Sequence, residues 1–581
     1  MNDITYLIKD PNEDVKKVAL GHSFFKMALK NINNFSDKQI TIIMQLFYQL
    51  GSMELLKHVL GKIEGRENLL NNIKADNDKV ISYKILEFLG FDIGDASKDA
   101  SPVEEVKKKI KQIQIKNRGV SLTKRGNYKI EPNTLAKYLT KRILAVRDSE
   151  GDVYVYDQGI YREIKETDLK TICRDILNEV DATIWKKKFE REYIDAFKME
   201  ISKIDNLESS KNKMAFKNGY FDLEKGKFFN FSPKIYFEYK LRYKYDSEAK
   251  AKRFEQFLDE IFEKDGERIQ LVKEILGYLL LEDRKIHKMY IFKGSGSNGK
   301  SVLIKIIQGM LGVKNVSTTP LKKLEGRFGL QDLEGKLVNI SSENELGGKN
   351  IDTENIKAIT GGDLLEVEKK NQDAFTTNIS TRLTASVNND FYFTDSSHSI
   401  LRRLLFIPFN VCFYEKPENP EEMRPDVMYQ DNQLQQCLLG ELSGIFNIAF
   451  KALQELKDND YVYTSSKACK KELERYIRYA NPIMSFMEDE LDIGADYEID
   501  KPELNRLFDR WQKSHGGEYK SISSTKAARL VEKALKKSGD HVLEKKVSGQ
   551  YVLEGIRARK KEIVNDSSDI PPTGKKLSSI G

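Results

Sequence analysis

Cysteine is scarce in this chain, and its residues are widely dispersed. The four cysteines are Cys173, Cys412, Cys437 and Cys469, and none belongs to a C-x-x-C pair or has paired histidines as companions. Disulfide-stapled domains and zinc fingers need closely spaced cysteines, so the pattern argues against both classes. It predicts a protein of a reducing, cytoplasmic compartment.

Long apolar runs are also missing. The longest strongly apolar stretch is 278–281, far below the roughly 20 residues that span a bilayer. The first residues, MNDITYLIKDPNED, contain neither a basic leader nor an apolar segment, so no secretion signal is expected. With 40% hydrophobic and 32% charged residues, the composition is typical of a soluble globular chain without a membrane partner.

Charge is plentiful but unevenly distributed. The whole chain carries +7, and the stretch Lys526–Lys561 alone holds eleven Lys or Arg against four Asp or Glu. A second basic run extends from Lys107 to Arg125. Each run fits either a solvated helix face or a nucleic-acid footprint, and charge alone does not choose between them.

A length of 581 residues predicts three to five domains at about 100–200 residues each. Apolar residues recur at helical spacing in several stretches, and β-rich runs flank turn signals in two others. Helices are therefore expected within 1–90 and at 103–113, 254–261 and 272–279, and hairpins at 153–161 and 218–230. The Gly-, Asp- and Ser-rich segment Phe91–Pro102 is expected to be a linker.

The C-terminal region predicts two helices followed by a hairpin. Asp500 and Glu503 have the spacing of a capping box that opens the first helix. A second helix is expected from Ser524 to near Gly539, with a hairpin after it. This order is typical of a winged helix, and its candidate DNA contacts are Lys526, Arg529 and Lys533.

One motif carries specific chemistry. Met289–Phe292 predicts an apolar strand, a glycine-rich loop follows it, and Val302–Met310 predicts a helix. The loop has the pattern G-x-x-x-x-G-K-[ST], and its candidate nucleotide-binding residues are Gly294, Gly296, Ser297, Asn298, Gly299, Lys300 and Ser301. Backbone N–H groups can face phosphate oxygens, Lys300 can reach the β and γ phosphates, and Ser301 can ligate Mg²⁺. The expected cofactors are ATP and Mg²⁺, and the alternative is an ordinary glycine turn.

Later segments can complete such a site. Glu343 follows a strand-like segment, and its carboxylate can polarise water or help hold the metal. Asn388 ends another strand-like segment, and its amide can orient water against the γ-phosphate. Arg402 or Arg403 can serve as the finger that completes a neighbouring subunit's site. Taken singly, the asparagine also fits a turn, and the arginines also fit surface ion pairs.

Together these residues resemble the superfamily 3 helicases of the phage and poxvirus primase–helicase type. The resemblance covers about residues 135–560 and rests on these segments: Asn218-Gly219, Leu276–Leu280, Gly296–Ser301, Leu324–Phe328, Ser342-Glu343, Thr360–Asp363, Arg402-Arg403 and Pro408-Phe409. It implies an AAA+ core with a helical collar, a hexameric ring and ATP-driven translocation along single-stranded DNA. Lys300 and Ser301 then match the phosphate loop, Glu343 the acid and Asn388 the sensor.

The resemblance also implies a pore hairpin over Gly361–Phe375. Its Lys369 and Lys370 would face the DNA backbone with Phe375 supporting them, since six basic loops around a ring attract a strand. An exposed turn is the alternative for the two lysines alone. The chain departs from many relatives because it offers a single acid at Glu343 and no D-x-D or D-x-E strand end. Primase activity is therefore not expected in this chain, and a separate primase is an expected partner.

The fold class predicted from these patterns is multidomain α/β. Its expected parts are a helical N-terminal region and linker (1–125), a small α+β domain (126–245), a helical collar (246–285), an AAA+ P-loop ATPase core (286–440), a returning collar or lid (441–485), a winged-helix-like DNA-binding domain (486–562) and a disordered tail (563–581).

The predicted function is ATP-dependent unwinding of duplex DNA for replication of a phage, plasmid or mobile genomic island. The Lys-, Ile- and Asn-rich composition fits an AT-rich genome. Single-stranded DNA, duplex DNA and further copies of the chain, most simply six in a ring, are the expected partners. One rival is an origin-binding initiator whose ATPase is mainly an assembly switch, and another is a motor for packaging or repair.

Overall fold

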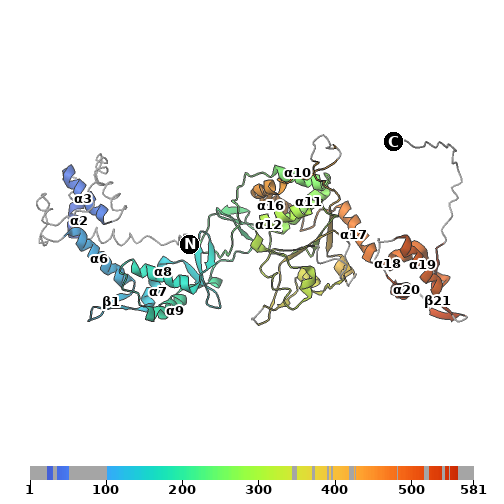
Figure 1. The fold of residues 1–581 in the computed structure, drawn as a ribbon, viewed down its shortest axis with the longest axis horizontal. Helices are drawn as coiled ribbons and strands as arrows, with labels where there is room; N and C mark the ends of the chain where they lie inside the picture. The colour runs from blue at the N-terminus through green and yellow to red at the C-terminus, as the bar shows by residue number, and fades with distance from the viewer. Residues whose placement is uncertain are drawn as a thin grey trace, which may run out of the picture. The chain divides into compact units, whose positions relative to one another are not determined.

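The protein combines helices with several β-sheets in a multidomain, mixed α/β architecture, as expected. The computed structural model describes residues 22–30, 36–50, 101–342, 350–369, 373–388, 392–393, 397–417, 424, 427–480, 482–515, 522–538, 544–547 and 550–559. The tail expected at 563–581 and residues 91–100 of the linker expected at 91–102 lie outside them, whereas Ser101 and Pro102 form the start of a helix. Two compact units result, one ending at Lys240 and the other beginning at Leu241 (Figure 1). None of the described helices has the length and apolarity required to cross a membrane.

Helices open the described part of the first unit. Ser36 caps α3 with a capping box, in which its side chain accepts the Gln39 N–H and the Gln39 side chain accepts the Ser36 N–H. The expected amphipathic helix is α6, and it buries Val103 and Val106. The helices of this unit are α2 (Ser23–Lys30), α3 (Asp37–Gln49), α6 (Pro102–Asn117), α7 (Pro132–Arg142), α8 (Glu166–Asn178), η3 (Lys187–Phe189), α9 (Glu190–Glu200) and η4 (Ile204–Asn206).

Both hairpins expected in the first unit are present. β4 and β5 are antiparallel and joined by Gln158 and Gly159, whose φ values of 47° and 99° fit a type I′ turn. A Cβ on Gly159 would lie 2.4 Å from the Phe231 ring, so this close approach also requires glycine. The sheets among the described residues are β1 (Val120–Leu122) with β2 (Tyr128–Ile130), then β5 (Ile160–Glu163), β4 (Val153–Asp157), β3 (Ala145–Arg147) and β6 (Ser202–Lys203), and then β7 (Lys213–Ala215), β8 (Tyr220–Asp222) and β9 (Lys227–Phe229).

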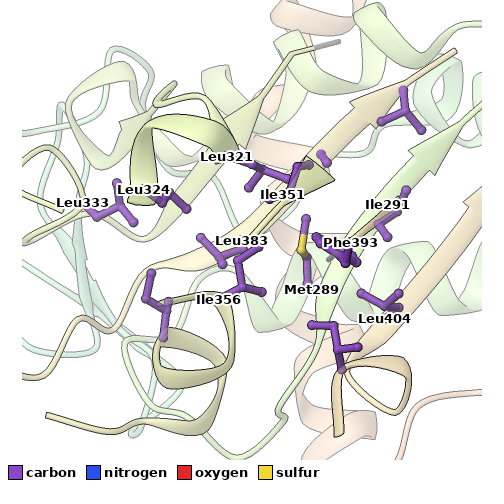
Figure 2. Packing of buried hydrophobic residues seen from close by; sticks show 14 of the residues in the cluster. Met289, Ile291, Leu321, Leu324, Leu333, Ile351, Ile356, Leu383, Phe393 and Leu404 are labelled. Atoms are coloured by element: carbon purple, nitrogen blue, oxygen red, sulfur yellow. The ribbon is translucent and has the colours of Figure 1, made fainter. Parts of the chain in front are cut away.

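A five-stranded parallel sheet forms the centre of the second unit. Its order is β11 (Val316–Ser317), β12 (Val338–Ser341), β16 (Arg382–Val387), β10 (Met289–Lys293) and β18 (Leu404–Pro408). Met289 and Ile291 of β10 point to the face where Leu383 and Ile356 also pack (Figure 2). Parallel strands end at one edge of a sheet, so the carboxyl ends of β10, β16 and β12 are neighbours there.

Helices α10 and α11 precede the phosphate loop, as expected. α11 packs on α16, and a Cβ on Gly277 at this crossing would lie 2.4 Å from the Ala449 carbonyl oxygen. Glu441 accepts the backbone N–H groups of Arg253 (3.1 Å) and Phe254 (2.9 Å), which ties the start of α16 to the start of α10. Figure 1 shows these helices gathered together. They are α10 (Lys252–Ile261), α11 (Gly266–Tyr278), α12 (Lys300–Leu311), α15 (Leu434–Gly440) and α16 (Leu442–Asp458).

Shorter elements connect the strands of the sheet. β14 and β15 form an antiparallel pair, and β13 pairs with β17 in parallel. The elements are η5 (Val313–Asn315), η6 (Leu321–Glu325), β13 (Asn350–Ile351), α13 (Glu354–Gly361), β14 (Leu365–Val367), β15 (Phe375–Thr377), β17 (Tyr392–Phe393) and α14 (His398–Leu401).

The C-terminal part pairs helices with the antiparallel sheet β19-β21-β20. Asp500 caps α19 by accepting the Glu503 N–H at 2.7 Å, which is the N-cap half of the capping box that its spacing predicts. Trp511 and Phe486 are buried together in this core. The elements are α17 (Lys467–Ala480), α18 (Pro482–Glu490), β19 (Leu491–Asp500), α19 (Lys501–Ser514), α20 (Ser524–Ser538), β20 (Glu544–Val547) and β21 (Gln550–Ala558).

Some expected domain limits fall inside these elements. The limit between 125 and 126 lies in the β1–β2 turn, whose strands share a core with Leu135. The limit between 485 and 486 lies within α18, whose Phe486 packs with Phe508 of α19. Helix α17 packs on β18 and places Tyr476 in the core of the central sheet, so it belongs to that core and not to a collar.

Candidate nucleotide-binding site

The glycine-rich loop between β10 and α12 has positive backbone φ angles, which residues with a side chain rarely adopt. Gly296 has a φ of 107°, Ser297 a φ of 47°, and Gly299 a φ of 85° at the position that caps α12. A Cβ on Gly299 would also lie 2.5 Å from Ile261 of α10. The loop therefore leads directly into the N-terminus of α12, where free N–H groups and the helix dipole favour an anion.

Lys300 lies at the centre of this loop and is only 4% exposed. Its Nζ donates to the Gly294 carbonyl oxygen and, at 2.8 Å, to the Oδ1 atom of Asn388. With its amide oxygen turned inward, Asn298 accepts from the Ser295 N–H (3.3 Å) and from Lys300 Nζ (3.2 Å). In these described contacts the ammonium group faces one backbone carbonyl oxygen and two amide oxygens, at the point where the loop can receive a phosphate.

The order of strands explains why Asn388 reaches Lys300. β16 lies between β10 and β12, so the residue that follows β16 stands beside the phosphate loop. The sequence placed Asn388 at a strand end but could not place β16 next to β10. Ser342 follows β12 and lines the same pocket, whereas the expected acid, Glu343, lies outside the described residues.

A pocket of about 470 Å³ opens over the loop and has walls that motif analysis did not identify. Arg253, Phe257 and Glu260 of α10 line one side, and Arg253 Nη1 bonds Glu260 at 3.2 Å. Tyr429 and Asp431 contribute to another side. These residues lie far from the motif in the chain. In the sequence, Phe257 is recognisable only as one of several apolar residues at helical spacing, which does not indicate a binding site.

Backbone hydrogen bonds hold this second wall against the loop. The Phe413 N–H donates to the Ser297 carbonyl oxygen at 2.7 Å. The Gln430 N–H donates to the Tyr414 carbonyl oxygen at 2.8 Å, and Gln430 Nε2 donates to the Phe413 carbonyl oxygen at 3.2 Å. Two segments separated along the chain therefore form one wall, tethered directly to the phosphate loop.

The two candidate finger arginines differ sharply in environment. Arg403 is 8% exposed, and its Nη1 donates to the Ser399 carbonyl oxygen (2.6 Å) and to Ser399 Oγ (3.1 Å). Burial lowers the pKa of the Arg403 guanidinium, and neighbouring Arg402 acts in the same direction. Arg402 is exposed, while its carbonyl oxygen accepts from Lys288 Nζ at 2.7 Å. The sequence could not decide which of these adjacent arginines is the better candidate. Their different exposure in the folded chain distinguishes them, because only Arg402 is accessible to a neighbouring molecule.

The expected pore hairpin corresponds to the antiparallel pair β14 and β15. Lys369 Nζ lies 5.1 Å from the centre of the Phe375 ring, so these two residues are brought together. Lys369 also forms an ion pair with Glu334 at 2.6 Å. The second basic residue, Lys370, lies outside the described residues.

The candidate DNA contacts at the C-terminus share one face of α20. Lys526, Arg529 and Lys533 are all exposed. Val531 and Leu535 of the same helix are buried in the C-terminal core. The basic side chains therefore face away from that core, an arrangement that the helical spacing alone predicted.

Two protein families match parts of the chain. Residues 133–263 match the family described as D5 N terminal like, and residues 292–403 match a family of unknown function, DUF5906. Neither match reaches half of the chain, but the second spans the phosphate loop, Asn388 and both arginines. Domains of these two kinds are typical of phage and viral primase–helicase proteins. Over these two segments the chain is similar to replication proteins of that type.

Solved structures of one protein were also found. The A form of the apo NrS-1 C-terminal region is 15% identical, and the match covers 72% of this chain and 97% of that chain with a TM-score of 0.38. Another apo structure of the NrS-1 C-terminal region (305–718) is 13% identical, with 74% and 99% covered and a TM-score of 0.40.

Proposed function

We propose that this protein is an ATP-hydrolysing DNA helicase of the superfamily 3 type, built on an AAA+ core. The observation that carries the proposal is the contact between Lys300 of the phosphate loop and Asn388 at the end of the adjacent strand. A structural glycine turn does not need a buried ammonium group aimed at a second strand end. A site that senses the γ-phosphate needs such a contact, because its cation and its amide must both reach the oxygen atoms of the γ-phosphate.

The residues around the pocket fit a magnesium-bound nucleoside triphosphate. The exposed Ser301 hydroxyl at the start of α12 can ligate Mg²⁺, and the loop N–H groups can bind phosphate oxygens. Tyr429 offers aromatic surface for the base, while Asp431 offers an acceptor for the sugar hydroxyls. Glu343 is proposed as the acid that activates water, since it follows β12 next to Ser342.

Ring assembly and DNA translocation are further parts of the proposal. In a hexamer, exposed Arg402 can reach the nucleotide bound by the neighbouring subunit, whereas Arg403 is held by Ser399 of its own chain. The β14–β15 hairpin with Lys369 and Lys370 would line the pore and contact the DNA backbone. Lys369 must then leave Glu334, a small cost because an exposed ion pair stabilises by about 0–1 kcal/mol.

A second candidate function is recognition of an origin duplex. The exposed basic face of α20, next to the strands β20 and β21, favours it, because such a helix can enter a major groove as in a winged helix. Initiator and helicase can then be one molecule, with the ATPase of the second unit serving both.

Strand displacement on a forked duplex, without a loader protein, tests the proposal. Lys300→Ala is expected to abolish both single-strand-stimulated ATP hydrolysis and displacement. Lys305→Ala is the matched control, because Lys305 is an exposed lysine on the same helix. Wild-type hydrolysis in Lys300→Ala would refute the site. Hydrolysis without displacement in the wild-type protein would favour the initiator.

A further inference from the structure

A second concave surface lies in the first unit, and none of the residues assigned to the nucleotide site lines it. The β1–β2 hairpin forms one side of it, and η3 with the start of α9 forms the other. The enclosed volume is about 660 Å³. We call it the hairpin groove and define it by five cations and two aromatic residues: Lys124, Arg125, Lys129, Lys186, Lys188, Tyr128 and Phe189.

The charge of the hairpin groove is strongly one-sided. Five Lys or Arg side chains line it, and the single acid among the lining residues is Glu192. Within the part of the chain that the structure describes, no ion pair neutralises any of these five cations. Positive charge that is left unpaired in a concavity attracts a polyanion, because field lines converge there.

The walls of the groove are fixed in place. Tyr128 donates through its hydroxyl to Asp181 (3.2 Å) and accepts from Lys186 Nζ through its carbonyl oxygen (3.1 Å). Asp181 is held in turn by Lys111 at 3.1 Å and by the Thr183 hydroxyl at 2.7 Å. These bonds also hold the pKa of Asp181 well below its usual range. The groove is therefore preorganised and needs little rearrangement to bind a ligand.

The hairpin tip is equally ordered. The Thr123 N–H donates to the Asn127 carbonyl oxygen (2.8 Å), and Thr123 Oγ1 accepts the Asn127 N–H (3.1 Å). Gly126 completes the turn with a φ of 74°. Lys124 and Arg125 lie at the tip of this closed turn and are exposed, so the turn presents two adjacent cations to solvent.

An aromatic face accompanies the cations. Phe189 is 39% exposed, an unusual state for a phenylalanine, and its ring packs on Tyr193 at 6.3 Å between centroids. Lys188 Nζ lies 4.6 Å from the centre of the Phe189 ring. A ring that is supported from below and flanked by cations is a stacking platform for a base whose phosphate the cations bind.

We infer that the hairpin groove binds single-stranded nucleic acid, a function separate from the nucleotide site and from the β14–β15 hairpin. Cations on the hairpin contact successive phosphates, and Phe189 stacks on a base. A strand with accessible bases uses both features, whereas a duplex offers only its phosphates to them. This inference also gives a role to Lys124 and Arg125, the last two cations of the basic run from Lys107 to Arg125.

The first three lysines of that run supply a matched control. Lys107, Lys108 and Lys109 are exposed on α6 and do not line the groove. Both triple alanine variants, one at Lys107–Lys109 and one at Lys124, Arg125 and Lys129, remove the same charge from the same unit. A purely nonspecific effect of net charge would change both variants equally.

The test is fluorescence anisotropy of the full-length protein with labelled oligo(dT) and oligo(U), each at several salt concentrations. A Lys369→Ala, Lys370→Ala background removes both lysines proposed for the β14–β15 hairpin from the measurement. The groove triple is expected to lower the salt slope by about 2 and the affinity on the order of 100-fold at 0.1 M salt, since each single-strand phosphate contact contributes about 0.7 to the slope. The Lys107–Lys109 triple is expected to change the affinity less than about threefold.

Phe189→Ala separates stacking from charge. It is expected to weaken binding by roughly 5- to 150-fold, the range for one stacked base, with an unchanged salt slope. Thermal melting followed by circular dichroism checks that each variant is folded, and Phe189→Leu, which keeps the packing on Tyr193, is the alternative if Phe189→Ala is not. Preference for oligo(U) or oligo(dT) tells RNA from DNA. Equal losses in both triple variants, or none in the groove triple, would overturn the inference.

Discussion

Complementation between two inactive variants tests the proposed ring and its arginine finger. The first variant, Arg402→Ala, keeps its phosphate loop but lacks the exposed arginine. The second, Lys300→Ala, lacks the loop lysine but keeps the arginine. If Arg402 acts on the neighbouring subunit's nucleotide, a mixed ring contains interfaces at which an intact loop meets an intact arginine. Neither pure variant contains such an interface.

The expected size of the effect follows from counting interfaces. Loss of an arginine finger lowers the turnover number by about 10³–10⁵, so each pure variant should show less than about 0.1% of wild-type activity. In rings formed from equal amounts of the two variants, about one interface in four pairs an intact loop with an intact arginine. Recovery to roughly a quarter of wild-type ATPase activity is therefore expected, far above either pure variant.

Arg403 provides the internal comparison. Its guanidinium bonds Ser399 of the same subunit, so Arg403→Ala should act within the chain that carries it and destabilise that chain by about 1–3 kcal/mol. An equal mixture of Arg403→Ala with Lys300→Ala should then recover much less activity. The assay is steady-state ATP hydrolysis after the subunits are mixed and reassembled, with mixed rings verified by two affinity tags. Absence of recovery with Arg402→Ala in verified mixed rings would refute the intersubunit role.

Three further predictions follow from the described contacts. Lys369→Ala should stop unwinding and reduce single-strand stimulation of the ATPase, measured on forks of unrelated sequence, while basal hydrolysis persists. Alanine at Lys526, Arg529 and Lys533 should lower the salt slope of duplex binding by about 2–3, and an unchanged slope in a titration would exclude the α20 face. Burial raises the pKa of the Cys173 thiol to about 12. The unfolded chain ionises this thiol near pH 9 and the folded chain does not, so stability should fall by about 1.4 kcal/mol per pH unit above pH 9. Melting curves at pH 8–10.5 should therefore decline less steeply for Cys173→Ala than for the wild-type protein.

Features encoded by neighbouring residues could be predicted from the sequence. The β4–β5 turn follows from Gln158-Gly159, because only a few residue types tolerate positive φ at both turn positions. The caps of α3 and α19 depend on side chains three residues apart, as with Asp500 and Glu503. The phosphate loop belongs to the same class, since its strand, glycines and helix are consecutive in the chain. All of these contacts span a few residues.

Features that depend on distant segments could not be predicted in this way. Strand order decides that Asn388 meets Lys300, and no local pattern reports which strand lies beside β10. The two adjacent arginines fit the finger motif equally well in the sequence. Packing in the folded chain buries Arg403 and leaves Arg402 exposed. The basic run near Arg125 also had two interpretations, a solvated helix face or a nucleic-acid footprint, and charge alone did not choose between them.

The hairpin groove and the walls of the nucleotide pocket also depend on distant segments and not on neighbouring residues. Composition and spacing by themselves determined that this chain is a multidomain α/β protein with basic helices, and they predicted a phosphate-binding loop. Tertiary structure alone brought Phe257 and Tyr429 over the loop and set Phe189 opposite the β1–β2 hairpin. The physical reason is that local sequence patterns reflect backbone preferences and the periodic burial of side chains along a helix or strand. A binding site is formed by side chains from several segments, and their separation in the chain does not determine their distance in space.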